Sequence, residues 1–404
     1  MSVDQIAGAA LAAIRERGTY RRMRVLSGAQ GPRMRVDGRD VLLFAGSNYL
    51  DLAQHPELVE ASARAARAHG CAAGGSRLIT GNLELHEALE AELAAFFGRG
   101  SALCFATGYM ANLGVIPALV GPGDAVISDA LCHASIIDGC RLSRAEVRVF
   151  PHAELEALER TLRDLAGGGR RILVAVDGVY SMDGDLAPLA ELVPLAHRHG
   201  ALVLLDDAHG TGTLGARGRG SAELCGVLDQ VDILVGTLGK SLGSFGAFAV
   251  GSGGLRDLLV NTARSFIFSC ALAPPQVESA RAALALVERE PWRRERLQAL
   301  AARLRAGLAA LGVSTAPSAT HIVPVQIGGN EETMAVSEAL LERGFYAQGI
   351  RHPSVPRGTS RLRITPMAGH AEADVDALVA ELGAVLPAGV SRSAQRPRPQ
   401  GHAA

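Results

Sequence analysis

The 404-residue sequence lacks an excess of charge of either sign. Its 40 lysine and arginine side chains nearly cancel its 41 aspartate and glutamate side chains. A protein that binds nucleic acid or an anionic membrane surface through general attraction usually carries a clear basic excess. We therefore expect no nucleic-acid partner, and any acidic substrate must be bound by a few local groups.

Clustered cysteines and long apolar runs are also missing. The six cysteines, at positions 71, 104, 132, 140, 225 and 270, form neither a CxxC motif nor a His/Cys cluster at metal-ligand spacing. This spacing predicts no metal site and suits a reducing compartment. No stretch approaches 18 continuous apolar residues, and the N-terminus lacks the basic and apolar regions of a signal peptide. We therefore expect a cytoplasmic protein without a membrane span.

Strand-like and helix-like segments alternate between residues 102 and 250. We expect strands at 102–105, 124–128, 146–150, 171–176, 201–206, 231–235 and 246–250, with helices such as 109–119, 153–165 and 187–199 between most of them. This alternation predicts an α/β fold with a mostly parallel seven-stranded sheet between helices. Ligands of such sheets bind at the carboxyl ends of the strands, so the loops there should carry the chemistry.

The pattern divides the chain into four parts. Residues 1–50 form an N-terminal arm with a helix at 4–18 and a short hairpin at 34–44. A large domain follows at 51–275, and a smaller α+β domain at 276–387. Residues 388–404 are rich in Pro, Arg, Ser and Gly, which is typical of a disordered tail.

Three strand-end loops are candidates for ligand contacts. The loop from Phe105 to Asn112 leads into a helix, so its glycine and the helix N-terminal amides can hold an anion, although an ordinary turn has the same pattern. His133 lies just beyond the next strand and is either structural or catalytic. The polar loop from Asp177 to Asp185 is either an Asp-rich turn or a ligand contact.

Asp206 and Lys240 are the most specific candidates for ligand contacts. Asp206 ends an apolar strand, where a carboxylate without a partner is costly to desolvate, and His209 can contact the same ligand. Lys240 lies among small residues at 236–243 and is either a surface charge or a buried amine that can form an imine. One strand–helix unit separates the pair, so both should lie at the same edge of the sheet.

Together these loops offer an anion cradle, a histidine that can stack on a ring, a carboxylate for a ring nitrogen, a second histidine and an imine-forming lysine. This set of groups matches pyridoxal 5'-phosphate (PLP), whose electronics are tuned by a carboxylate at its pyridinium nitrogen. The sequence therefore predicts a PLP-dependent enzyme.

Eight stretches between about residues 40 and 385 carry a family resemblance. They are Ser-Asn-Tyr-Leu at 47–50, Gly-Gly-Ser-Arg-Leu-Ile-Thr-Gly at 74–81, Thr-Gly-Tyr-Met-Ala-Asn at 107–112, Asp-Ala-Leu-Cys-His-Ala-Ser at 129–135, Val-Tyr-Ser-Met-Asp-Gly-Asp at 179–185, Asp-Asp-Ala-His-Gly-Thr-Gly at 206–212, Thr-Leu-Gly-Lys at 237–240 and Pro-Arg-Gly-Thr-Ser-Arg-Leu-Arg at 356–363. With them the chain resembles the α-oxoamine synthases, which are fold-type I PLP enzymes. This resemblance implies an acyltransferase that works as a homodimer with shared active sites.

The resemblance also implies a role for each matched residue. Lys240 binds PLP as an imine, Asp206 pairs with the pyridine nitrogen, and His133 stacks on the ring. The resemblance implies that the ring hydroxyl is contacted by His209 and Ser181, and that the phosphate is bound by Gly108, Tyr109 and Thr237. It also implies that Ser269 reaches the phosphate of the partner subunit, and that the substrate is bound by Ser47 and Arg363. Arg21, in a basic cluster that also suits a solvated turn, is a further candidate for substrate binding.

The implied reaction is a decarboxylative condensation of an amino acid with an acyl-CoA or an acyl-carrier thioester. Freed Lys240 removes the Cα proton, Arg363 holds the carboxylate, and His133 assists the loss of CO2 as a hydrogen-bond donor. We expect L-alanine with pimeloyl-CoA, a step of biotin synthesis. Glycine with acetyl-CoA or succinyl-CoA, and L-serine with palmitoyl-CoA, remain alternatives. An inactive partner subunit and a plain aminotransferase are less favoured, because the lysine and the histidine context are intact.

Overall fold

The computed structural model describes residues 1–387 and 390, which form two compact units. The larger unit comprises Ser47–Ser181 and Asp185–Leu297. The smaller unit comprises Met1–Gly46, Met182–Gly184 and the described residues from Gln298 onward. The division at residues 50, 275 and 387 stays a prediction, and nearly all of the predicted tail, 388–404, lies outside the described residues.

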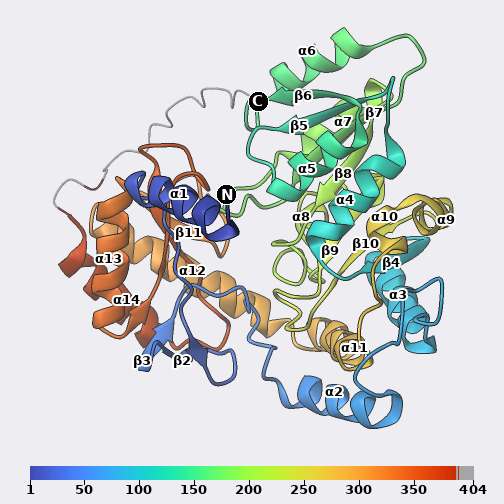
Figure 1. The fold of residues 1–404 in the computed structure, drawn as a ribbon. Coiled ribbons are helices and arrows are strands. Elements are labelled where there is room, and N and C mark those ends of the chain that lie inside the picture. Colours follow the sequence, from blue (N-terminus) through green and yellow to red (C-terminus); the bar gives the residue numbers. More distant parts are fainter. Residues whose placement is uncertain (388–389, 391–404) are drawn as a thin grey trace. The chain divides into compact units, whose positions relative to one another are not determined.

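A seven-stranded sheet organises the larger unit (Figure 1). Its order is β4-β10-β9-β8-β7-β5-β6, and β10 is antiparallel to both neighbours whereas the other pairs are parallel. The strands are β4 (Ser101–Phe105), β5 (Ala125–Asp129), β6 (Glu146–Phe150), β7 (Ile172–Asp177), β8 (Leu202–Asp206), β9 (Ile233–Thr237) and β10 (Ala247–Gly251). The predicted α/β fold with a mostly parallel sheet is confirmed.

Successive residues of the central strands face opposite sides of this sheet. In β7, Val174 and Val176 belong to one apolar core, whereas Leu173 and Ala175 belong to the other. Apolar residues on both faces are what a parallel sheet covered by helices requires. The strands are thereby fixed on both sides, and so are the starting points of the loops at their carboxyl ends.

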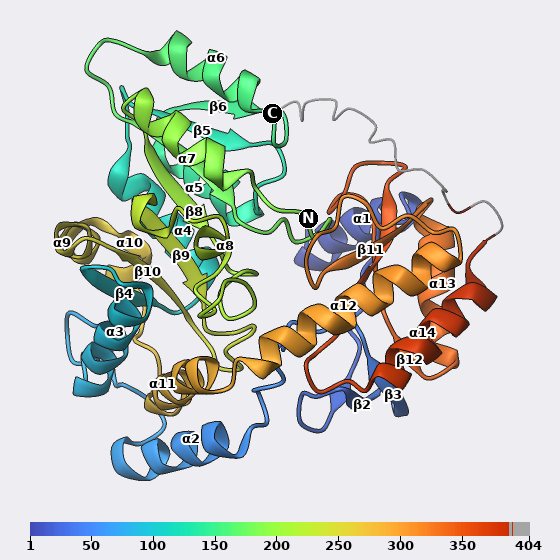
Figure 2. The same ribbon diagram turned by 180° about the vertical axis from the view of Figure 1, so that it is seen from behind.

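Helices cover both faces of the sheet, as the two opposite views show (Figure 1 and Figure 2). Side chains of α4, α5, α9 and α10 pack in the core that contains Leu173, and side chains of α2, α3, α6, α7, α8 and α11 pack in the core that contains Val174. The helices are α2 (Pro56–His69), α3 (Glu84–Phe97), α4 (Gly108–Leu119), α5 (Ala134–Ser143), α6 (Leu155–Leu165), α7 (Leu189–Arg198), α8 (Ser221–Leu224), α9 (Gly253–Thr262), α10 (Arg264–Ile267) and α11 (Pro274–Arg289).

The smaller unit contains two small sheets, ordered β1-β2-β3-β12 and β11-β14-β13. The predicted hairpin is present, because β2 and β3 pair antiparallel and turn at Asp37 and Gly38, whose positive φ angles of 48° and 82° suit a tight turn. The elements are α1 (Val3–Glu16), β1 (Leu26–Ser27), β2 (Arg33–Val36), β3 (Arg39–Leu43), α12 (Trp292–Ala310, which contains the boundary between the units), β11 (Val323–Gly328), α13 (Asn330–Glu342), β12 (Phe345–Tyr346), β13 (Gln348–Ile350), β14 (Ser360–Ile364) and α14 (Glu372–Val385).

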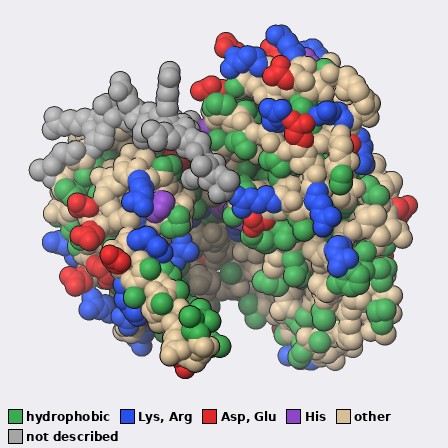
Figure 3. All heavy atoms as spheres, turned by 45° about the horizontal axis from the view of Figure 1, so that its top comes forward, with side chains coloured by type: hydrophobic (Ala, Val, Ile, Leu, Met, Phe, Trp, Pro, Cys, Tyr) green, Lys and Arg blue, Asp and Glu red, His purple; other side chains and the backbone are tan. Residues whose placement is uncertain are grey.

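Charged side chains of both signs are interspersed on the face drawn in Figure 3. Mixed signs keep the long-range attraction for a polyanion small, in line with the net charge of −1. Among the described residues, no helix has both the length and the apolar character needed to cross a membrane.

Candidate active site

The carboxyl ends of neighbouring parallel strands meet at one edge of the large sheet. Asp177 ends β7, Asp206 ends β8, and the strand register pairs these two residues directly. Thr237 ends β9 on one side of them, and Asp129 ends β5 on the other. The loops that were predicted to carry the chemistry therefore start side by side.

Lys240 lies in the loop after β9 and contacts a histidine from the loop after β8. Its Nζ atom lies 2.9 Å from Nε2 of His209, and the Nδ1 atom of the same ring lies 2.8 Å from the hydroxyl of Tyr49. Tyr49 is fully buried, so its hydroxyl holds the imidazole in one orientation. The lysine amine is thus held at the sheet edge by a hydrogen-bonded chain that runs through His209 to Tyr49.

The Asp206 carboxylate is buried and is held by two donors. The Nδ2 amide of Asn112, on α4, donates to Oδ2 at 2.7 Å, and the Ala208 backbone amide donates to Oδ1 at 3.1 Å. A buried carboxylate needs such partners to offset its loss of hydration. The same Asn112 amide lies 2.9 Å from the hydroxyl of Ser135, which links Asp206 to the histidine loop.

His133 is the N-cap residue of α5, and its contacts fix its tautomer. Its Nδ1 atom accepts from the Ser135 backbone amide at 3.3 Å and lies 2.7 Å from the Ser135 hydroxyl. Burial lowers the pKa of His133, the charge of Lys240 adds to this effect, and Asp206 opposes it. The neutral imidazole therefore carries its proton on Nε2, where the ring can act as a donor.

Asp177 holds the backbone of the same loop. Its Oδ2 atom accepts from the backbone amide of His133 at 2.8 Å. Burial and the negative charge of Asp206 raise the pKa of Asp177 well above its usual range. Asp177 and Asp206 end neighbouring strands, so the backbone of the His133 loop is tied to the strand end next to Asp206.

The first turn of α4 has the features of an anion site. Thr107 caps the helix by accepting from the backbone amide of Met110 at 3.2 Å, and the amides of Gly108 and Tyr109 have no intrahelical acceptor. A Cβ atom built on Gly108 would meet nothing within 4 Å, so there is open space beside this residue. Amides without an intrahelical acceptor at the positive end of a helix, with open space beside them, suit a phosphate group.

Comparison with known proteins finds relatives over most of the chain. Residues 39–382 match the family "Aminotransferase class I and II". The chain is 53% identical over 374 residues to 8-amino-7-oxononanoate synthase from Geobacter metallireducens, covering 92% of this chain and 95% of that protein. It is 49% identical to the protein of the same name from Anaeromyxobacter dehalogenans, covering 94% of this chain and 95% of that one. The chain belongs to the α-oxoamine synthases.

Solved structures agree with this assignment. Serine palmitoyltransferase from S. paucimobilis, solved with a bound PLP–myriocin aldimine, has a TM-score of 0.90 at 34% identity and covers 95% of this chain and 98% of that one. An 8-amino-7-oxononanoate synthase from Francisella tularensis has a TM-score of 0.73 at 25% identity and covers 85% and 97%. This α-oxoamine synthase is thus a PLP-dependent enzyme of fold type I, as its sequence predicts.

The residues at the sheet edge fit PLP. Asp206 offers a buried carboxylate for a protonated ring nitrogen, and His133 offers a neutral imidazole that can face a ring. Lys240 offers the amine, and the Gly108 region offers amides beside open space. These groups belong to one compact unit, so the set is assembled without any residue of the smaller unit.

Four further predicted residues also lie in the larger unit. Thr237 donates from Oγ1 to the Gly246 carbonyl at 3.1 Å, and Ser269 donates from Oγ to the Ser265 carbonyl at 2.7 Å. Ser181 follows β7 and is half-buried. The hydroxyl of Tyr109 donates to Asp138, and the residue is 41% exposed. Their contacts to the cofactor stay predictions.

The predicted substrate residues are divided between the units. Ser47, in the larger unit, has its Oγ atom 3.5 Å from the hydroxyl of Tyr49. Arg21 and Arg363 belong to the smaller unit. Arg21 donates to the Ser354 hydroxyl at 3.1 Å, and Arg363 is buried at the middle strand of the β11-β14-β13 sheet. Their substrate contacts also stay predictions.

Sequence reasoning missed three residues that the structure brings into the site, namely Tyr49, Asn112 and Ser135. Each lies inside a stretch that was singled out, but none was given a role. Tyr49 and His209, for example, are 160 residues apart in sequence. The sequence pattern does not indicate that two such distant side chains form a hydrogen bond.

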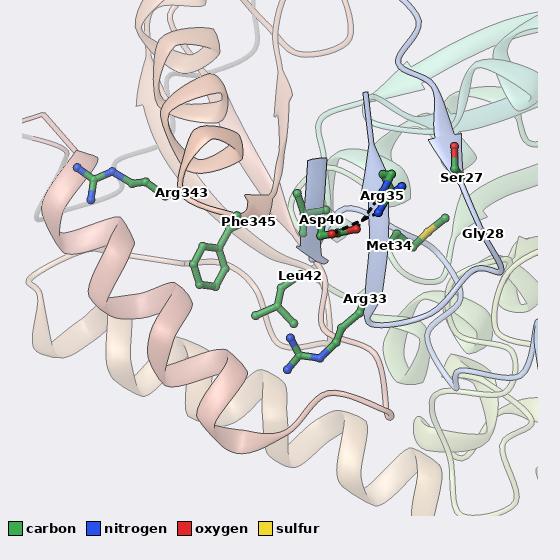
Figure 4. A pocket seen from close by; sticks show the side chains of 11 residues that line it. Ser27, Gly28, Arg33, Met34, Arg35, Asp40, Leu42, Arg343 and Phe345 are labelled. Atoms are coloured by element: carbon green, nitrogen blue, oxygen red, sulfur yellow. Dashed lines mark hydrogen bonds and ion pairs between the residues drawn. The ribbon is translucent and has the colours of Figure 1, made fainter. Parts of the chain in front are cut away.

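The smaller unit also has a cavity of about 760 Å³, shown in Figure 4. Residues of β2, β3 and the segment at 343–345 line it, including three arginines. Each guanidinium group already faces a carboxylate: Arg35 pairs with Asp40 at 3.1 Å, Arg33 with Asp374 at 2.9 Å, and Arg343 with Glu381 at 2.7 Å. This cavity contains none of the predicted site residues.

Proposed function

We propose that this α-oxoamine synthase condenses L-alanine with pimeloyl-CoA to give 8-amino-7-oxononanoate, coenzyme A and CO2, a step of biotin synthesis. The observation that carries the proposal is the 51–53% identity to three curated 8-amino-7-oxononanoate synthases over 91–92% of the chain. The assembled Lys240, Asp206 and His133 supply the chemical groups that such a reaction needs.

Lys240 is the proposed base. When bound, PLP supplies an electron sink that stabilises negative charge at the substrate Cα. The Lys240 amine takes the Cα proton, and His209, with Nε2 at 2.9 Å, orients this amine. Asp206, which Asn112 and the Ala208 amide hold in place, would keep the proton on the ring nitrogen. The Gly108 and Tyr109 amides and the Thr237 hydroxyl would hold the phosphate, and Ser181 would contact the ring hydroxyl. The residues proposed for the substrate are Arg363, Ser47 and Arg21.

His133 is the proposed hydrogen-bond donor during the condensation and the loss of CO2. A carbon–carbon bond forms between Cα and the acyl carbon, the carbon–sulfur bond breaks, and the thiol leaves. The carboxyl group then leaves as CO2, and a proton returns to Cα. His133, with its proton on Nε2, donates a hydrogen bond to the acyl oxygen as charge builds there.

We also propose that the enzyme is a homodimer that works in the cytoplasm, which its free cysteines suit. Two segments of the larger unit, at 75–79 and 268–271, are joined by the Ala271 amide, which donates to the Gly75 carbonyl at 3.0 Å. They present Ile79 and Phe268 at 79% and 71% exposure. Large apolar side chains at such exposure suit a contact with a second copy, and Ser269 lies beside them.

A serine palmitoyltransferase-like activity is the second candidate, because the structures of that enzyme have the higher TM-scores. Sequence identity favours the alanine reaction, at 53% against 34%. The test is a matrix of L-alanine, glycine and L-serine against acyl-CoA thioesters of increasing chain length, with thiol release as the readout. We expect L-alanine with pimeloyl-CoA to give the highest kcat/KM. A preference for L-serine with palmitoyl-CoA would support the second candidate instead.

A further inference from the structure

A buried histidine that the proposed reaction does not use lies between two carboxylates near the site. His152 follows β6, and its Nδ1 atom lies 2.9 Å from Oδ1 of Asp129. Its Nε2 atom lies 2.7 Å from Oδ2 of Asp185. The side chains of His152 and Asp129 are 3% and 1% exposed, so water does not screen this contact. The edge of the imidazole meets the ring of Tyr180, with 4.3 Å between the ring centroids.

Both ring nitrogens of His152 face an acceptor, which fixes its protonation state. A neutral imidazole donates from one nitrogen only, whereas an imidazolium donates from both. Burial on its own lowers the pKa of His152, but the hydrogen bonds and charges of Asp129 and Asp185 outweigh it and raise the pKa to about 9. The histidine is therefore a buried cation between two carboxylates at neutral pH.

One end of this bridge holds the loop that carries His133. Asp129 ends β5, and its Oδ1 atom also accepts from the Leu131 backbone amide at 2.8 Å. Its Oδ2 atom accepts from the Ala153 backbone amide at 2.9 Å. Asp129 therefore ties the start of the His133 loop to the loop that follows β6, through backbone amides of both.

The other end of the bridge holds the loop that carries Ser181. Asp185 closes this loop, because its carbonyl accepts from the Tyr180 amide at 3.0 Å and an isolated bridge pairs Val179 with Leu186. The His152 contact fixes the carboxylate of the same residue. Two loops from different strands are thus joined through a single charged ring.

We infer that His152 is a positioning residue, whose imidazolium locks the His133 loop and the Ser181 loop together at the cofactor edge of the sheet. The inference deepens the proposed function and rests on its assignment of His133 and Ser181 to the cofactor. A buried ion pair is weak evidence for stability. Here its two hydrogen bonds are directional and reach two different loops, so their effect is on the position of these loops. Catalysis depends on that geometry, because a displacement of about 1 Å at the reacting groups can lower the rate about a hundredfold.

The test compares His152→Gln and Asp185→Asn with the parent holoenzyme. Asp185→Asn keeps the imidazole and its packing, so it serves where His152→Gln fails to fold. For both we expect kcat to fall about tenfold to a hundredfold while KM for L-alanine changes little. The visible circular dichroism of bound PLP, which reports how the ring is held, should weaken in both variants.

His197→Gln is the matched control. His197, in α7, also contacts a carboxylate at 2.9 Å, but its partner Asp232 lies just before β9, at the opposite edge of the sheet. The His197→Gln variant should keep the parent's kcat and the visible circular dichroism of bound PLP. Bridge variants that lose only melting temperature, and keep both readouts, would overturn the inference. If the parent prefers another substrate pair, the proposed substrates fail, but the dichroism comparison still decides the role of His152.

Discussion

The side-chain amine of Lys240 lies 2.9 Å from Nε2 of His209 and is held there by a ring that the buried Tyr49 orients. Lys240 is also the only lysine among the 404 residues. All the other lysine-or-arginine positions are arginine, whose guanidinium group stays charged. The one amine side chain of the protein is thus placed where we propose that the cofactor binds.

The single lysine makes the cofactor attachment directly testable. Borohydride treatment of the PLP-loaded enzyme should fix a pyridoxyl group on one peptide, the one that contains Lys240, as read by mass spectrometry. Lys240→Ala should remove this label and lower kcat about a hundredfold to ten-thousandfold, because the proposed base is lost. Lys240→Arg keeps the charge and should be equally inactive, since a guanidinium is not a base at neutral pH. Substantial turnover by either variant would contradict the proton-transfer role.

Replacing Asp206 tests the proposed contact between its carboxylate and the ring nitrogen of PLP. Asp206→Asn keeps the shape of the side chain but removes the charge that Asn112 and Ala208 hold in place. We expect kcat to fall at least about a hundredfold, because a charge placed to stabilise the reacting ring is lost. The control is Asp232→Asn, at the other edge of the sheet. Equal kcat in the two variants would argue against the role of Asp206.

The strands of the large sheet were predictable because their apolar runs are short and bounded by loops. β5 was expected at 124–128 and lies at Ala125–Asp129. The antiparallel direction of β10 was not foreseen, because its composition resembles that of its neighbours. The connection from β9, residues 238–246, is too short for a crossover helix, so β10 returns antiparallel.

The helix α9 was also missed, for a local reason. It starts with Gly253 and Gly254, residues of low helix propensity, yet Ser252 caps it by accepting from the Leu255 amide at 3.1 Å. In the site, residues at strand ends could be predicted, since strand ends share one edge. Contacts such as that of Tyr49 with His209 could not, because they depend on how distant segments pack.

The stability of the smaller unit should depend on pH through His370. This imidazole is fully buried, stacks on Phe44 with 4.1 Å between ring centroids, and accepts from the Met367 amide at 2.9 Å. Burial lowers its pKa to about 4, against about 6.5 in the unfolded chain. Between these values only the unfolded state binds the proton, so stability falls as pH falls through this window, by about 3 kcal/mol in all.

His370→Gln keeps an acceptor for Met367 and does not titrate. Hydrogen exchange of the β14 amides, followed from about pH 7 to pH 4, should show a smaller loss of stability in this variant than in the parent. His352→Gln, at a partly exposed histidine of the same unit, should behave like the parent. Parallel curves for the parent and His370→Gln would show that His370 does not cause the acid sensitivity.

The phosphate site can be tested with a pair of matched glycines. Gly108 and Gly253 are each the first residue of a helix, and a Cβ atom built on either meets nothing within 4 Å. Alanine at either position should therefore leave the folded chain intact. At Gly108 the added methyl group occupies the open space beside the helix amides, where we propose that the phosphate binds. The dissociation constant of the Gly108→Ala variant for PLP should rise about tenfold or more, since one charge-assisted hydrogen bond contributes about 1.5–3 kcal/mol.

Gly253→Ala separates this effect from any change in helix propensity. Both substitutions favour a helical backbone over the unfolded chain to a similar degree, so their effects on the melting temperature of the cofactor-free protein should agree. Only Gly108→Ala should weaken PLP binding, measured by titration of the cofactor's absorbance. Because the two variants differ only in which helix start is filled, equal affinities for PLP would place the phosphate away from α4. A loss confined to Gly108→Ala would place it there.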